Sequence, residues 1–215
     1  MGSNEDIPVY NETVLVTGFG PFGVHTVNAS SESVKLLATL DLERELGIRL
    51  ITKEIPVIYD YVQTNIPLLW ENYKPKLVVH VGVSGTAQEL NLEAQAFNTG
   101  YCSFDITGQL PKGGVCVEGC PQQLESAIDM RKICQNMNDS PCCDVVSCVS
   151  TDPGQYLCDF IYYTSLNIDR SRTAFVHVPV LDKPYSARQL AQALKLVIAG
   201  MLEQVRENDR KKNSN

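Results

Sequence analysis

The sequence has few cationic residues, few histidines and no long apolar run. Its 18 Lys and Arg residues are outnumbered by 25 Asp and Glu, and the formal net charge is -7. Nucleic-acid binding depends on clustered cations that neutralise phosphates, so this balance argues against a nucleic-acid surface. No stretch contains the roughly 18 consecutive apolar residues of a membrane helix, which argues against a membrane partner. Small molecules or peptides are the expected partners.

The two ends of the chain also lack targeting features. Residues 1–8 have neither the basic region nor the apolar core of a secretory signal. The three adjacent cations 210–212 are too few for a basic motif. We therefore expect a cytosolic protein with flexible ends at about 1–12 and 207–215. No internal repeat or linker divides 1–215, so we expect a single domain and favour a monomer.

Apart from Cys158, the chain has seven other cysteines, which we interpret as reduced, buried or incidental thiols: Cys102, Cys116, Cys120, Cys134, Cys142, Cys143 and Cys148. Disulfides would require an oxidising compartment, which nothing in the sequence indicates. A structural zinc site is the alternative, because Cys116 and Cys120 are four residues apart and the Cys142–Cys143 pair follows. No paired Cys-x-x-Cys motif occurs, and the three histidines are distant in sequence. We therefore expect no metal.

Apolar runs alternate with helical patterns along the chain. The runs predict strands at 13–17, 48–53, 77–83, 144–149 and 173–179, and the periodic segments predict helices at 30–46, 59–73, 124–137, 153–166 and 187–206. Several strands are continuous Val, Leu and Ile runs, as in strands buried on both faces. The expected fold is α/β, a three-layer sandwich with a central mostly parallel or mixed sheet flanked by helices. The Gly- and Pro-rich segment 102–121 predicts a loop, either beside the site or on the surface.

The segment 18–23 matches the dinucleotide-binding pattern G-x-G-x-x-G and follows a strand. Pro21 interrupts it, and the next four residues delay the helix until about Asn28 or Ser30, which weakens the predicted phosphate site. Phe19 and Phe22 could instead line a small, flat apolar pocket or fold back on the core. A nucleotide-dependent oxidoreductase therefore remains an alternative.

Cys158 is the candidate nucleophile. We predict a helix that begins at Pro153 with Asp152 as N-cap, which places Cys158 in the second turn. The helix dipole acts mainly within the first turn, so we assign most of the thiol's activation to His177, the imidazole in the strand 173–179. Taken alone, both residues fit core positions better than catalytic ones, because a lone Cys on an amphipathic helix or a lone His in an apolar strand is more often a core residue.

Several short motifs occur in a set order: 16–23, 27–30, 79–85, 92–93, 98–101, 156–160 and 175–179. With them, nearly the whole chain resembles the pyroglutamyl-peptidase I family of cysteine peptidases. The resemblance implies hydrolysis of pyroglutamyl-blocked peptides through a thioester, without a metal or organic cofactor.

The resemblance also implies residue roles. Cys158 corresponds to the nucleophile, His177 to the general base, and Glu93 to the carboxylate that orients the imidazole. Without the resemblance, Glu93 would fit a solvent-facing strand position. The residues implied to enclose the pyroglutamyl lactam are Phe19, Phe22, Val83 and Tyr156.

Four positions depart from the family pattern. Ser31 replaces the usual Trp, and Phe97 stands where animal relatives often have His. Ahead of the nucleophile, Pro153 and Gln155 stand where animal relatives often have Ala and Arg. None of these changes removes a residue of the implied triad. A non-catalytic relative that binds blocked peptide N-termini is a second alternative, although the intact triad argues against it.

Overall fold

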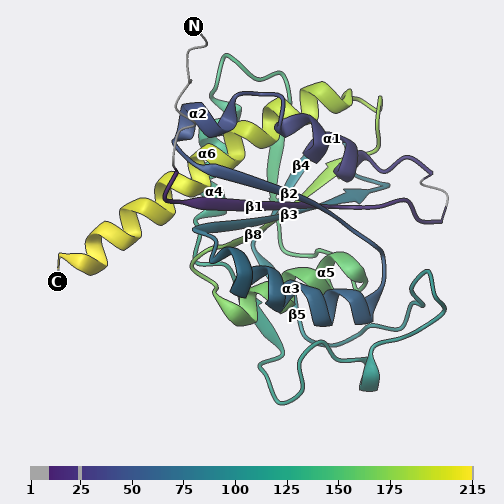
Figure 1. The fold of residues 1–215 in the computed structure, drawn as a ribbon. Helices are drawn as coiled ribbons and strands as arrows, with labels where there is room; N and C mark the ends of the chain where they lie inside the picture. Colours follow the sequence, from purple (N-terminus) through teal and green to yellow (C-terminus); the bar gives the residue numbers. More distant parts are fainter. Residues whose placement is uncertain (1–9, 24–25, 215) are drawn as a thin grey trace, which may run out of the picture.

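The computed structural model describes residues 10–23 and 26–214, and it has three layers with a sheet in the middle (Figure 1). The six-stranded sheet has the order β2-β1-β3-β8-β4-β7, and the β4–β8 pair is antiparallel while the other pairs are parallel. This confirms the predicted fold class. Its strands are β1 Thr13–Phe19, β2 Arg49–Ile55, β3 Leu77–Ser84, β4 Leu90–Glu93, β7 Ser147–Ser150 and β8 Thr173–Pro179.

Helices cover both faces of the sheet. On one side lie α1 Ala29–Leu37 and α6 Ala187–Asn213, and on the other lie α3 Tyr59–Tyr73 and α5 Leu157–Ile168 (Figure 1). Successive side chains of a strand point to opposite faces. Val14 and Val79 therefore join the core under α1 and α6, whereas Leu15 and Val78 join the core under α3 and α5. The continuous apolar strands of the sequence are thus buried on both faces.

Two predicted helices differ in the structure. The predicted helix 30–46 is broken into α1 and α2 Leu42–Leu46, because Asp41 takes a left-handed conformation (φ 53°). The predicted helix 124–137 divides into β6 Gln123–Glu125 and α4 Met130–Asn138, and the Asp129 side chain caps α4 by accepting from Lys132 N. The short strands β4, β5 Gln95–Phe97 and β6 were not predicted, because three or four residues give too little alternation to recognise.

The predicted start of the helix that carries Cys158 was also wrong. The helix α5 begins at Leu157, not at Pro153. Gly154 has φ 77°, which ends any helix there, and the Asp152 side chain accepts from Gly154 N instead of capping a helix. Cys158 therefore lies in the first turn of α5.

Residues near both ends of the described chain are held by ion pairs. Glu12 contacts Lys76 and Arg206, and Asp209 contacts Lys76 and Arg172. The helix α6 continues to Asn213, where the sequence had indicated a frayed end from 207. In the described chain, no helix combines the length and the apolar character needed to cross a bilayer.

A buried polar chain connects the sheet to α3 and α5. The His80 ring is hydrogen bonded to Thr17 Oγ1 (2.7 Å) and to Ser165 Oγ (2.7 Å), and Ser165 Oγ also accepts from Trp70 Nε1 (3.0 Å). Burial lowers the pKa of His80 to about 3, so the ring is neutral at neutral pH. Ser165 satisfies two buried groups at once, which makes it the central member of this chain.

We predict that Ser165→Ala lowers the free energy of unfolding by about 2–4 kcal/mol, because it leaves the Trp70 N–H and one His80 nitrogen without a partner in the core. Urea denaturation measures this change. Ser103→Ala is the matched control: its side chain is exposed, and we expect a change within about 0.5 kcal/mol. Equal stability of the two variants would contradict the role given to this chain of hydrogen bonds.

Candidate active site

Cys158 and His177 meet above a glycine at the carboxyl ends of the central strands. His177 on β8 is paired with Gly82 on β3. A Cβ atom added to Gly82 would lie 2.7 Å from Cys158 Sγ and 3.2 Å from His177 Cδ2. The thiol and the imidazole therefore share the space that a side chain would occupy at position 82. Sequence motifs gave no sign of this role for Gly82.

His177 is held by a buried carboxylate. Its Nδ1 lies 2.8 Å from Glu93 Oε1, and the Glu93 side chain is fully buried. Glu93 is on β4, which runs antiparallel to β8 and places Glu93 diagonally across from His177. The solvent-facing interpretation of Glu93 is therefore wrong. With Nδ1 engaged, the other ring nitrogen is the one left to interact with Cys158.

The pKa of His177 results from opposing effects. Burial alone lowers it, but the charges and hydrogen bonds of Cys158 and Glu93 outweigh burial and raise the pKa to about 10. The imidazolium form of His177 is therefore favoured at neutral pH. The geometry places the Cys158 thiol beside this charged ring, as the activation of a cysteine nucleophile requires.

The start of α5 adds a second influence on the thiol. Cys158 is the second residue of the helix, and the N-cap Tyr156 provides no side-chain cap. The first N–H groups of a helix have no intrahelical acceptor, and the helix dipole favours negative charge there. This corrects the interpretation in which Cys158 lay beyond the reach of the dipole.

A small apolar pocket adjoins Cys158. It lies at the carboxyl ends of the neighbouring strands β1 and β3. The strand order reverses there, because β2 lies on one side of β1 and β3 on the other, and such a point is a usual ligand position in α/β sheets. The structure brings together here all four residues of the predicted lactam pocket. The lining residues are Phe19, Phe22, Asn28, Val57, Val83, Tyr156, Leu157 and Cys158.

Asn28, Val57 and Leu157 were not predicted to line this cavity. Asn28 caps α1, with its Oδ1 accepting from Ser30 N (3.0 Å), and its Nδ2 donates to Gly20 O (2.9 Å). The Asn28-Ala-Ser sequence at a helix start was the signal that could have identified it. Val57 and Leu157 carried no signal beyond their apolar character.

The glycine loop differs from a dinucleotide-binding loop. Phe19 N donates to Ser30 Oγ (2.9 Å), and the start of α1 is capped by Asn28. The N–H groups that would bind a phosphate in a dinucleotide site are thus used by side chains of the chain itself. The oxidoreductase alternative has no support in this geometry.

The positions that depart from the family pattern have defined surroundings. Ser31 is buried, and its hydroxyl donates to Asn28 O (3.1 Å) beside the cavity. Gln155 is exposed, and its amide lies directly against Gly100. Both residues are close to the site, and neither takes the place of Cys158, His177 or Glu93.

The cysteines of the zinc alternative do not come together. Cys116 is buried against α5, where its Sγ lies 3.2 Å from Thr164 Oγ1, while Cys143 packs in the core on the opposite face of the sheet. Within 10–23 and 26–214, no group of three His, Cys, Asp or Glu side chains could hold a metal ion. The structural zinc interpretation is therefore unsupported.

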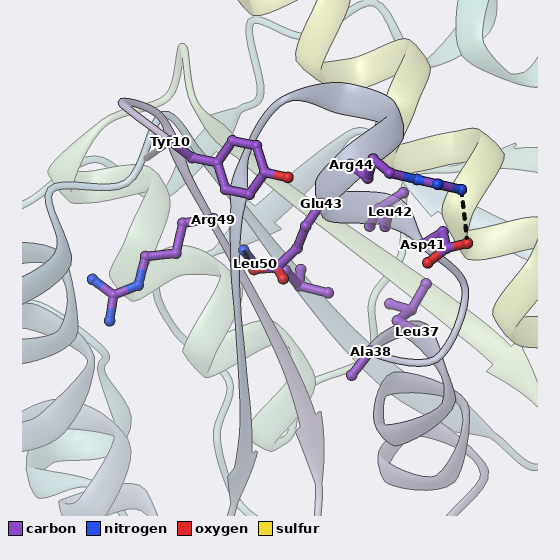
Figure 2. A pocket seen from close by; sticks show the side chains of 9 residues that line it. All are labelled: Tyr10, Leu37, Ala38, Asp41, Leu42, Glu43, Arg44, Arg49 and Leu50. Atoms are coloured by element: carbon purple, nitrogen blue, oxygen red, sulfur yellow. Dashed lines mark hydrogen bonds and ion pairs between the residues drawn. The ribbon is translucent and has the colours of Figure 1, made fainter. Parts of the chain in front are cut away.

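A larger, open hollow lies at the other end of the sheet, near α2 and the start of β2 (Figure 2). In Figure 2, Arg44 is paired with Asp41, and Arg49 extends away from the other lining residues. The lining contains neither a cysteine nor a histidine. Size alone would favour this hollow, but it lacks the chemistry found beside Cys158.

Comparisons with known proteins agree with the geometry. A family model described as pyroglutamyl peptidase matches residues 12–203. The chain is 46% identical to human pyroglutamyl-peptidase 1 over 94% of this chain and 95% of that protein, and 49% identical to the mouse protein over 89% and 90%. The crystal structure of pyroglutamyl peptidase I from Bacillus amyloliquefaciens has the same fold, with a TM-score of 0.79 at 22% identity over 89% of this chain and 97% of that one. The chain belongs to the pyroglutamyl peptidase family.

Proposed function

We propose that this protein is a cysteine exopeptidase that hydrolyses the amide bond after an N-terminal pyroglutamyl residue. Cys158 is the nucleophile, His177 the general acid and base, and Glu93 the carboxylate that orients the imidazole. The observation that carries the proposal is the chain of contacts from Glu93 through His177 to Cys158, with 2.8 Å between Glu93 Oε1 and His177 Nδ1. The three residues lie beside an apolar pocket in a member of the pyroglutamyl peptidase family, which supports pyroglutamyl-blocked peptides as the substrate class.

The first half of the reaction forms a thioester. The Cys158 thiolate attacks the pyroglutamyl carbonyl carbon, and the electron pair of the C=O bond moves to the oxygen. N–H groups at the uncapped start of α5 stabilise this oxyanion. The intermediate collapses as the C–N bond breaks, and the leaving amine takes a proton from the His177 imidazolium. The shortened peptide leaves with a free amino terminus.

The second half releases pyroglutamate. The neutral His177 imidazole takes a proton from water, and the hydroxide adds to the thioester carbon. The C–S bond then breaks, which regenerates the thiolate beside the imidazolium. Glu93 stabilises the charged ring and keeps Nδ1 engaged in both steps, so the ring presents the same nitrogen to the reaction throughout.

The cavity supports selectivity for a blocked amino terminus. Its walls are formed mainly by the apolar surfaces of Phe19, Phe22, Val57, Val83 and Tyr156. Tyr156 is wedged between aromatic neighbours, with ring centroids 6.4 Å from Phe22 and 5.9 Å from Tyr59. An uncyclised N-terminus would bring an ammonium group that must lose its water, at a cost of several kcal/mol, whereas a lactam carries no charge. The cytosolic location and the monomeric state stay predictions.

We predict that Cys158→Ala lowers kcat/KM on a fluorogenic pyroglutamyl amide by at least about 1000-fold, because no other group replaces the thiolate. Cys102→Ala removes an exposed thiol and is expected to keep activity within about twofold. Wild-type protein that binds the amide without cleaving it would instead support the non-catalytic alternative. Full activity in the Cys158 variant would contradict the role of this residue.

We predict that Cys158→Ala also lowers the pKa of His177 from about 10, because it removes a negative neighbour and leaves burial to act against Glu93. NMR titration of the histidine ring signals measures this change, and a His177→Gln variant assigns the signal. His80 stays neutral above pH 5 and does not interfere. In the wild type, the imidazolium persists up to high pH and is lost only as the pH approaches 10. An unchanged pKa in the variant would contradict the thiolate–imidazolium pair.

We predict that Gly82→Ala lowers kcat by about 100-fold or more, because its Cβ would displace both Cys158 Sγ and His177 from their present positions. Gly85→Ala is the control, since a Cβ atom there meets no atom within 4 Å. Steady-state kinetics and a thermal melt of each variant separate loss of alignment from loss of folding. Normal kcat in a folded Gly82→Ala protein would show that the site tolerates the displacement.

A further inference from the structure

Asp159, the residue after Cys158, is a fully buried carboxylate that the reaction above does not use. It accepts a hydrogen bond from Phe97 N (2.8 Å). Its other oxygen lies 3.2 Å from the Tyr101 hydroxyl, whose proton is shared between Asp159 and the closer Phe97 O (2.5 Å). Successive residues of a helix point about 100° apart, so Asp159 faces away from the direction of Cys158. The first turn of α5 therefore holds the nucleophile on one side and is tied to the segment 97–101 on another.

The segment 97–101 contacts the chain on both sides of the nucleophile. Gly100 (φ 101°) lies so close to Gln155 that a Cβ atom there would be 2.8 Å from the Gln155 amide. Tyr101 also packs edge-on against Phe160 (ring centroids 5.1 Å apart), two residues after Cys158. Residues before and after the thiol thus rest on the same short stretch of backbone. We call the segment 97–101 the brace.

The brace is itself fixed to the rest of the protein. Asn98 N donates to Gln122 O (2.9 Å), and Asn98 Oδ1 accepts from Val117 N (2.8 Å). The Asn98 amide group donates to Val117 O (2.8 Å), and Asn98 O accepts from Cys116 N (2.8 Å). A backbone held at this many points can act as a rigid support, and Asp159 is the side chain that connects it to the first turn of α5.

The charge of Asp159 is not what makes this connection. Burial, together with Asp152 and Glu93, raises the pKa of Asp159 to about 7 against the opposing effect of its two hydrogen bonds. The other titratable groups that interact with it are Tyr59, Tyr101, Tyr162 and Cys116, none of which is a cation. A protonated carboxyl can still accept from Phe97 N while its O–H faces the Tyr101 oxygen. Both protonation states can therefore keep the connection.

We propose that Asp159 is a positioning residue for hydrolysis: by accepting hydrogen bonds from Phe97 N and the Tyr101 hydroxyl, it fixes the first turn of α5 and aims the Cys158 thiol at His177. The proposal rests on the function given above. It assigns Asp159 no contact with the substrate and no part in proton transfer. Its effect should therefore appear in kcat and in the reactivity of the thiol.

Asp159→Ala removes both hydrogen bonds. We expect it to lower kcat on a pyroglutamyl amide by about 10- to 100-fold with KM changed less than about threefold. The rate at which iodoacetamide alkylates Cys158, followed by mass spectrometry of its peptide, should fall by at least about fivefold. Asp159→Asn keeps an acceptor for Phe97 N and should restore both values to within about threefold of the wild type. Asp152→Asn removes a nearby exposed carboxylate and is the control for charge alone.

Other outcomes would overturn the proposal. If Asp159→Asn is as impaired as Asp159→Ala, the negative charge matters and the hydrogen bonds do not. If Asp159→Ala only melts at lower temperature, with kcat and alkylation unchanged in the folded protein, the residue is merely structural. If Asp159→Ala fails to fold, Tyr101→Phe takes its place, because it keeps the ring and removes the hydroxyl that connects Asp159 with Phe97 O. A loss of about threefold or more in both kcat and alkylation supports the proposal, and unchanged values contradict it.

The alkylation rate also separates this proposal from the function on which it rests. A wild-type protein that does not cleave pyroglutamyl amides would refute the function, while slower alkylation in Asp159→Ala would still support positioning.

The pH dependence of stability gives an independent check. A carboxyl whose pKa is raised in the folded state stabilises the fold at low pH and loses that contribution as the pH rises toward 7. The melting temperature of Asp159→Asn minus that of the wild type should therefore increase as the pH rises from 5 to 8.

Discussion

The site depends on a buried carboxylate that must be paired. Glu93 is fully enclosed by the sheet, and a carboxylate in such a place is costly unless a positive or hydrogen-bonding partner meets it. His177 is that partner, which explains why the imidazole keeps its proton in spite of its own burial. Other parts of the site follow from this pair: Gly82 makes room beside the ring, and α5 brings the thiol to it.

The start of α5 serves the site in two ways. Gly154 delays the helix to Leu157, so Cys158 lies in the first turn with uncapped N–H groups nearby. The same turn presents Asp159 to the brace. A helix that began at Pro153 would have placed the thiol one turn deeper, beyond the strongest part of the dipole. The late start of α5 therefore links the chemistry of the thiol to its mechanical support.

Much of the fold could be predicted from the sequence, because long apolar strands and amphipathic helices have strong periodic patterns. The strands β1, β3 and β8 and the helices α3 and α6 belong to this group. The patterns failed where the elements are short or where one backbone angle decides, as at β4 and at Asp41. The family was predicted correctly from the motifs, and the resemblance implied Cys158, His177 and Glu93 as the candidate catalytic residues. Gly82 and Asp159 lie within the matching motifs, but the resemblance gave them no role, because that role depends on which atoms lie next to them.

The sequence by itself determined the layered α/β architecture, the family and the candidate catalytic side chains, since these depend on residue type and order along the chain. Tertiary structure alone decided that Glu93 is buried, that Cys158 and His177 share the space above Gly82, and that Asp159 faces the brace. These facts join residues that are tens of positions apart in the chain. Local propensity carries no information about such distances, which are set when the strands pair and the helices pack on them.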